Sequence, residues 1–235
     1  MQVLIIIPTH NEAENIEALV NEIGIRLKTK HSILIVDDNS NDGTKEKINN
    51  LQNQYNNIHI IHRQEKKGLA SAYIEGLTYG LENGFDTFIE MDADFSHDPK
   101  YLSEFLVHIE TNDLVIGSRY IKNGQTKNWK LTRKIISKLG CLYSQIVLNT
   151  KIKDLTGGFN CWNKSILEKI DLSTIISRGY SFQIEMKYKA HKNNAKIKEI
   201  PITFTERKKG KSKLNFNIIL EALINVIKIK FNISK

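Results

Sequence analysis

The sequence contains little cysteine and no long uncharged apolar segment. Only Cys141 and Cys161 occur among its 235 residues, and they do not have the spacing of metal ligands. We therefore expect a reduced, cytosolic compartment. No run of about 18 uncharged apolar residues is found, so the sequence predicts no ordinary membrane span. The first residues, MQVLIIIPTH, lack the basic start of a signal peptide and are typical of a buried strand.

Several common catalytic motifs are also missing. Neither G-x-G-x-x-G nor G-x-x-x-x-G-K-[ST] occurs, which disfavours a dinucleotide oxidoreductase and a P-loop NTPase. The seven histidines show no H-E-x-x-H spacing, and we expect His10 and His97 at the surface or behind ligating residues. No Ser-His-Asp or Cys-His order indicates a covalent nucleophile. A phosphate ligand held by a metal and arginines suits what remains.

Positive charge is in excess. The chain has 34 Lys and Arg against 26 Asp and Glu, a net charge of +8, which favours a polyanionic partner, although solvated surface lysines explain it equally well. Residues 127–138 hold five Lys or Arg and no acid, and residues 206–213 hold five and one acid. Both segments adjoin glycine or aromatic loop residues, which favours phosphate binding. The charge does not follow one helix, so no nucleic-acid partner is predicted.

Short apolar strands alternate with helical patterns in the first half. We expect strands at 3–7, 33–36, 58–61, 87–91 and 114–117, the first ended by Pro8 and followed by a helix capped by Asn11. This order predicts an α/β fold with a mostly parallel sheet covered on both faces. The second half predicts a long helix that opens with the basic segment 127–138 and runs to about 148, a helix at 179–192, a strand at 196–206 and a final helix at 216–231.

Ligands of such sheets bind beyond the carboxyl ends of the strands, where MDADFSHDP holds three aspartates. Clustered carboxylates are costly without a cation. Asp98 precedes Pro99 and fits a helix cap. Capping does not explain Asp92 and Asp94, which would share one side if the strand continued to them. We predict that they bind a divalent cation that bridges to a diphosphate.

Two further strand ends carry candidate ligands. In DDNSNDGT, we assign Asn41, Asp42 and Gly43 to a turn and Asp38 to a nucleobase or ribose. Arg119 follows the fifth strand and is expected to face the same edge as Asp94.

The motifs taken together have a family resemblance. In chain order they are PTHNEAENI, DDNSNDGT, KKGLASAYIEG, MDADFSHDP, GSRY, Trp129 to Arg133, DLTGGFN, GYSFQIEM and EIPITFTERKKGKSKL. The chain resembles inverting glycosyltransferases of the GT-A fold, family 2, and within them the polyprenol-phosphate (dolichol-phosphate) mannose synthases. The resemblance covers nearly the whole chain, and the later motifs are specific to this branch.

The resemblance implies roles for individual residues. The nucleotide pocket would be lined by Pro8, His10 and Glu12, with Val36 and Asp38 at the base and Asp92, Ala93 and Asp94 at the ribose, metal and diphosphate. Mg²⁺ or Mn²⁺ would be held by Asp92, Asp94 and Ser96. The donor diphosphate or acceptor phosphate would be bound by Arg119, Arg133, Arg207 and Lys213, which with Asp94 form the catalytic set. His10 replaces the usual tyrosine, and Ser96 replaces a glutamine of some relatives.

The implied reaction moves mannose from GDP-mannose to a dolichyl or polyprenyl phosphate with inversion. The acceptor phosphate is already an anion and needs no general base. Three alternatives stay open: another donor such as UDP-glucose, a polysaccharide hydroxyl as acceptor, or nucleotide-sugar binding without turnover.

A lipid acceptor implies a peripheral enzyme on the cytosolic face of a membrane, with a small membrane partner subunit as one option. We expect a catalytic domain at 1–213 and an amphipathic, membrane-interfacial helix within 214–235. Its apolar face would comprise Phe216, Ile219, Leu220, Leu223, Val226 and Ile227. Packing of this helix against the catalytic domain is the alternative.

Overall fold

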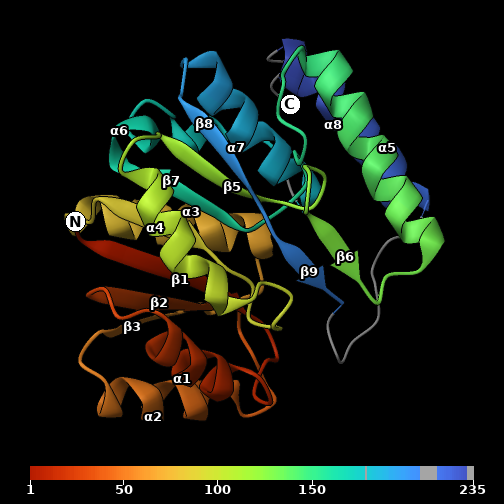
Figure 1. Ribbon diagram of the computed structural model, residues 1–235. Coiled ribbons are helices and arrows are strands. Elements are labelled where there is room, and N and C mark those ends of the chain that lie inside the picture. The colour runs from red at the N-terminus through yellow and green to blue at the C-terminus, as the bar shows by residue number, and fades with distance from the viewer. Residues whose placement is uncertain (178, 207–215, 232–235) are drawn as a thin grey trace.

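The structure, a computed structural model, describes residues 1–177, 179–206 and 216–231 (Figure 1). Within these residues the main sheet has the strand order β3-β2-β1-β4-β7-β5-β8. Only β7 runs antiparallel to its neighbours in this sheet. The strands are β1 (Val3–Thr9), β2 (His31–Asp37), β3 (Ile58–His62), β4 (Thr87–Glu90), β5 (Leu114–Ser118), β7 (Asn160–Asn163) and β8 (Ile197–Pro201). The predicted mostly parallel α/β sheet is confirmed.

Helices cover both faces of this sheet. They are α1 (Ile16–Arg26), α2 (Thr44–Gln54), α3 (Leu69–Glu82), α4 (Leu102–Ile109), α5 (Leu131–Leu148), α6 (Lys164–Leu167), α7 (Tyr180–Lys192) and α8 (Phe216–Phe231), with 3₁₀ turns at Pro99–Tyr101 and Leu172–Thr174. Along β1, Val3, Ile5 and Ile7 join the core under α1, α2 and α4, whereas Leu4 and Ile6 join the core under α3 and α7. This alternation is what buries a strand on two faces.

β1 and α1 differ from the expectation at their ends. β1 continues through Pro8 to Thr9, because Pro8 faces the side of β4, and β4 has already ended at Glu90. No ladder partner is therefore lost at the proline nitrogen. α1 begins at Ile16, so Asn11 does not cap it. Asn11 has a φ of 61° and accepts a hydrogen bond from the Asn41 backbone N–H at 3.0 Å.

A small second sheet and a helix pair complete the described chain. β6 (Gln125–Lys127) pairs in parallel with β9 (Thr203–Thr205), so the single strand expected at 196–206 is divided between two sheets. α8 packs against α5 and α7, and Figure 1 shows α5 and α8 together at one side of the molecule. Among the described helices, none is both long and apolar enough to cross a membrane. The expected domain boundary at 213/214 falls outside the described residues.

Candidate active site

The loops after β1, β2 and β4 meet at the carboxyl edge of the sheet. β1 pairs with both other strands, and its partnership with β2 extends to Thr9 and Asp37. Beyond the strands, the Glu12 backbone N–H donates to Thr44 Oγ1 at 2.9 Å. In Figure 1 this edge is turned toward β6 and β9. The segments PTHNE, DDNSNDGT and MDADFSHDP, which follow these three strands, thus lie close together, as the parallel strands require.

The aspartates of MDADFSHDP lie in a turn after β4, because that strand ends at Glu90 and strand alternation does not extend to them. Asp92 and Asp94 are half-buried. Asp92 Oδ1 accepts a hydrogen bond from Tyr73 Oη at 3.0 Å, and Asp94 Oδ1 accepts one from the Ser96 backbone N–H at 3.0 Å. Asp98 caps the next turn by accepting from the Lys100 N–H, so the predicted cap is confirmed.

Ser96 is the residue in this turn with an unused polar atom. It is 3% exposed, and its Oγ is buried without a hydrogen-bond partner. Buried hydroxyls are normally paired, so this oxygen has hydrogen-bonding capacity left for a ligand. In the described part of the chain, no three His, Cys, Asp or Glu side chains are arranged so that they alone could hold a metal ion. Carboxylates of Asp92 and Asp94 with Ser96 Oγ nevertheless supply the hard oxygens that Mg²⁺ or Mn²⁺ takes, and they fit such an ion.

His97 orders the same turn from a buried position behind Asp92, which is the second of the two positions expected for it. Its ring is buried and stacks on Phe159, with ring centroids 4.7 Å apart. His97 Nδ1 accepts a hydrogen bond from the Asp92 backbone N–H at 3.0 Å. Burial lowers the pKa of His97 against the opposing pull of Asp92 and Asp94, which keeps the ring neutral and Nδ1 able to accept. His97 therefore fixes the backbone that carries Asp92.

The first loop offers one more unused polar atom. His10 is half-buried, and its Nδ1 is buried without a hydrogen-bond partner. Pro8 is buried in β1, and Glu12 accepts a hydrogen bond from Asn15 Nδ2 at 2.8 Å. Their predicted contacts with a nucleotide stay predictions.

Asp38 is held by protein groups. Its carboxylate accepts hydrogen bonds from Arg63 Nη1 and from the backbone N–H groups of Lys67 and Gly68, at 2.8 to 2.9 Å. Burial alone would raise the pKa of Asp38, but these donors outweigh it and lower the pKa. Asp38 thus orders the loop before α3, and its contact with a base stays a prediction.

Val36 and Ala93 do not present side chains to a ligand. Val36 is fully buried in the core under α3, and Ala93 is buried in the core on the opposite face. Only their backbone groups could meet the base or ribose expected from the resemblance.

Arg119 has an acidic partner that sequence reasoning missed. Its buried guanidinium donates to both carboxylate oxygens of Asp154, at 2.7 and 2.6 Å, and to Thr156 Oγ1 at 2.8 Å. Burial would raise the pKa of Asp154, but attraction to Arg119 outweighs it and lowers the pKa. The geometry gives Arg119 a role in holding the 154–158 loop, and its contact with a phosphate stays a prediction.

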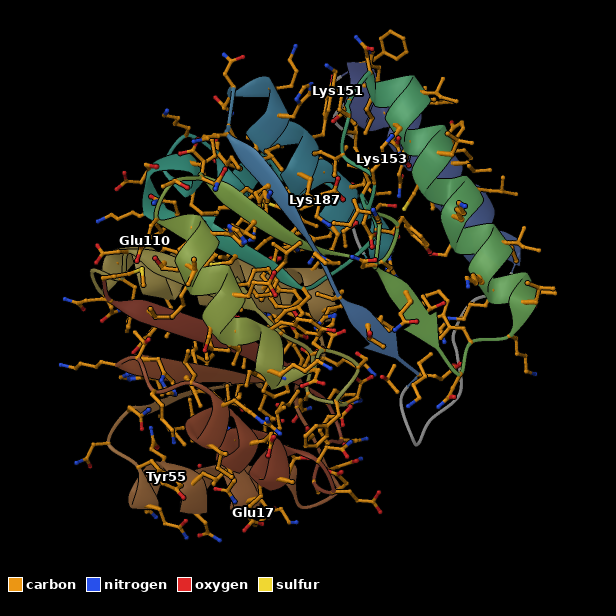
Figure 2. The ribbon with its side chains drawn as sticks, in the orientation of Figure 1. Glu17, Tyr55, Glu110, Lys151, Lys153 and Lys187 are labelled. Carbon is orange, nitrogen blue, oxygen red and sulfur yellow. The ribbon has the colours of Figure 1, made fainter. Side chains whose placement is uncertain are left out.

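Lys187 of α7 stabilises the same 154–158 loop through hydrogen bonds to its backbone. It is fully buried, and Nζ donates to the backbone carbonyls of Asp154, Leu155 and Gly157 at 3.0, 3.3 and 2.6 Å. Burial lowers its pKa to about 8. Figure 2 labels Lys187 on α7. Helical spacing alone gave no signal for this residue, since lysines in helices are usually solvated.

Arg133 lies near Arg119 across a tryptophan. The guanidinium carbons of Arg133 and Arg119 lie 4.0 and 5.4 Å from the Trp129 ring centroid. Arg133 also forms an ion pair with Glu206, while its Nε is buried without a hydrogen-bond partner. Two guanidinium groups therefore lie against one indole, each paired with a carboxylate. Arg207 and Lys213, the other predicted phosphate ligands, lie outside the described residues.

Comparison with known proteins gives consistent matches. The model of the family "Glycosyl transferase family 2" matches residues 4–171. An undecaprenyl-phosphate mannosyltransferase of Micrococcus luteus is 41% identical, covering 96% of this chain and 93% of that protein. A polyprenol monophosphomannose synthase of Mycolicibacterium smegmatis is 42% identical, covering 95% and 84%. A dolichol-phosphate mannosyltransferase of Pyrococcus furiosus is 37% identical, covering 97% and 64%.

A solved structure has the same fold. Glucosyl-3-phosphoglycerate synthase from Mycobacterium tuberculosis, crystallised with Mn²⁺, uridine diphosphate and glucosyl-3-phosphoglycerate, superposes with a TM-score of 0.69. The match covers 98% of this chain and 79% of that chain at 13% identity. At this identity the likeness shows the fold alone.

Proposed function

Since the chain belongs to glycosyl transferase family 2, we propose that it transfers mannose from GDP-mannose to the phosphate of a dolichol or other polyprenol. The observation that carries the proposal is the 41 to 42% identity, over at least 95% of the chain, to two proteins named for mannose transfer to polyprenyl phosphate. The donor nucleotide comes from the resemblance of the sequence motifs.

The turn at Asp92 and Asp94 would receive the donor diphosphate. Tyr73 and His97 hold Asp92 from two sides, through its carboxylate and its backbone N–H, so the turn is ordered before a ligand arrives. Mg²⁺ or Mn²⁺, held by Asp92, Asp94 and Ser96, would supply positive charge to the leaving diphosphate. His10, with its unused Nδ1, would lie against the nucleoside.

The two arginines that lie against Trp129, Arg119 and Arg133, would receive the acceptor phosphate. The second pKa of a phosphate monoester is ~6, so the acceptor is mostly a dianion at neutral pH and can attack the anomeric carbon without a general base. Arg133 would orient this dianion, exchanging part of its ion pair with Glu206 for the phosphate. Arg207 and Lys213 are proposed to complete the phosphate contacts. Catalysis would come from positioning and charge neutralisation.

A transfer assay tests the proposal. Purified protein is incubated with Mg²⁺ or Mn²⁺, dolichyl phosphate and either GDP-mannose or UDP-glucose. Formation of dolichyl phosphate mannose from GDP-mannose is the expected result. Transfer from UDP-glucose instead would show that GDP-mannose is not the donor. Binding of nucleotide sugar without any transfer would contradict the proposed transferase activity. Activity of the purified chain alone would also show that the possible membrane partner subunit is dispensable.

A further inference from the structure

α5 exposes an unusual row of large aliphatic side chains. Leu131, Ile135, Leu139, Leu142 and Ile146, here called the apolar stripe, are each 49 to 71% exposed. Their spacing of three and four residues places them on one face of the helix. Single exposed aliphatics are ordinary, but a continuous row of five along one helix marks an interaction surface. From Leu131 to Ile146 the stripe extends over about 23 Å along the helix.

α8 lies beside α5 and lengthens this surface. Tyr143 Oη of α5 donates to the Leu223 carbonyl of α8 at 3.1 Å. Ile224, Ile227 and Phe231 of α8 are 46 to 69% exposed. Val226, which the sequence placed on the same membrane face as Ile227, is instead buried. The apolar face expected for α8 is therefore divided between the interior, at Val226, and the surface, at Ile227.

The segment that contains the stripe has charged side chains of one sign only. Residues 127–153 contain seven Lys or Arg and no Asp or Glu. The lysines Lys130, Lys134, Lys138, Lys151 and Lys153 are all exposed. Figure 2 labels Lys151 and Lys153 just beyond the carboxyl end of α5. An exposed apolar row in a segment whose own charged residues are all cations matches the interface of an anionic phospholipid bilayer.

We propose that the apolar stripe of α5, extended by the outer residues of α8, docks the protein onto an anionic bilayer. The proposal rests on the proposed function for its purpose, because a polyprenyl phosphate resides in such a bilayer. The stripe begins at Leu131, two residues before Arg133 in the same helical turn. Docking along α5 thus brings Arg133 to the phosphate level of the lipid, whereas docking along α8 alone would not require this.

Vesicle binding tests the surface directly. The double variant Leu139→Glu/Ile146→Glu changes two stripe residues, and Ile25→Glu/Val107→Glu changes two aliphatics on α1 and α4 that are 60 and 65% exposed. Each protein is sedimented with phosphatidylglycerol–phosphatidylcholine vesicles. We expect at least tenfold weaker binding for the stripe variant and unchanged binding for the control. Lys134→Glu/Lys138→Glu should weaken binding several-fold and lessen the preference for anionic over neutral vesicles.

Two acceptors separate docking from catalysis. With a short-chain, water-soluble polyprenyl phosphate the stripe variant should match the wild type, which also shows that it folds. With long-chain polyprenyl phosphate in vesicles its rate should fall at least tenfold. Absence of all transfer by the wild type would count against the proposed function, while the vesicle result would still decide the docking surface.

Three results would overturn the proposal. The first is wild-type-like vesicle binding by the stripe variant. The second is equal loss of binding in the control variant. The third is a wild-type dimer that the stripe substitutions convert to monomer, because the stripe would then be covered by a second copy of the chain.

Discussion

Two acidic loops lie against each other in this fold and use their aspartates differently. The first is the turn at 92–97, and the second is the loop at 154–158. Phe159, which follows the second loop, stacks on His97 of the first. Asp94 is half-buried beside a buried hydroxyl that has no partner. Asp154 is fully buried, and both of its carboxylate oxygens are bonded to Arg119.

The comparison separates acids that we predict to bind a ligand from an acid, Asp154, that supports the fold. A carboxylate can be buried at low cost when protein donors satisfy it, and then little capacity remains for a ligand. The Asp154 carboxylate accepts from Arg119, which directly follows β5, and from the Gly157 N–H of its own loop, while Lys187 of α7 donates to the Asp154 backbone carbonyl. The first loop leaves the buried Ser96 hydroxyl without a hydrogen-bond partner, and it is the loop expected to act in transfer.

The comparison is sharpened most by Asp94→Ala. We expect mannose transfer to fall on the order of 10³-fold, because charge stabilisation of the leaving diphosphate would be lost. The melting temperature should stay nearly unchanged, because Asp94 is half-buried. Steady-state rates and thermal denaturation measure the two effects. Near-normal turnover with added Mn²⁺ would contradict the assignment.

Asp154→Asn should act mainly on stability. It leaves the Arg119 guanidinium buried without its counter-charge, which costs about 3 to 4 kcal/mol of unfolding free energy. Urea denaturation measures this loss, and Glu82→Gln, which removes the same charge from an exposed position, is the control. A fully stable variant that has lost activity would place Asp154 with the ligand-binding acids and break the comparison.

Lys187→Met tests the support under the second loop. Three backbone carbonyls lose their donor, so unfolding free energy at pH 7 should fall by about 2 kcal/mol. The pKa of Lys187 is lowered to about 8 in the folded protein, below the ordinary value of 10.5. Between these two pH values the unfolded chain binds more protons, so wild-type stability rises with pH.

The variant lacks this contribution. The stability difference in favour of the wild type should therefore widen as pH rises above about 8. Urea denaturation of both proteins at several pH values measures it. A constant difference would mean that Lys187 titrates alike in both states.

The sequence predicted the sheet well where strands are apolar. β1, β2, β4 and β5 are buried along their whole or nearly whole length, and their composition alone indicates strands. β7 was missed, because its four residues, NCWN, have polar ends. They form a strand only by pairing antiparallel between β4 and β5, which is a tertiary effect.

In the candidate site, local sequence patterns could be predicted, whereas contacts between distant residues could not. The density of carboxylates at 92–98 identified the first loop, and the cap by Asp98 followed from Pro99. Asp154 lies 35 residues from Arg119, and no local pattern links two such residues. Lys187 and His97 read as ordinary polar positions until the fold buries them. The roles of Asp154, Lys187 and His97 depend on burial and on contacts between distant residues, which local sequence patterns do not show.

Ser96→Ala probes the smallest difference between the loops. Ser96 Oγ has no partner in the protein, so its removal should leave unfolding free energy unchanged or raise it by up to about 1 kcal/mol. The same change should raise the Mn²⁺ concentration for half-maximal transfer about tenfold, because one ligand oxygen is lost. Ser103→Ala on the exposed side of α4 is the control. Loss of stability with unchanged metal dependence would make Ser96 a supporting residue, and the unused hydroxyl would no longer distinguish the first loop from the second.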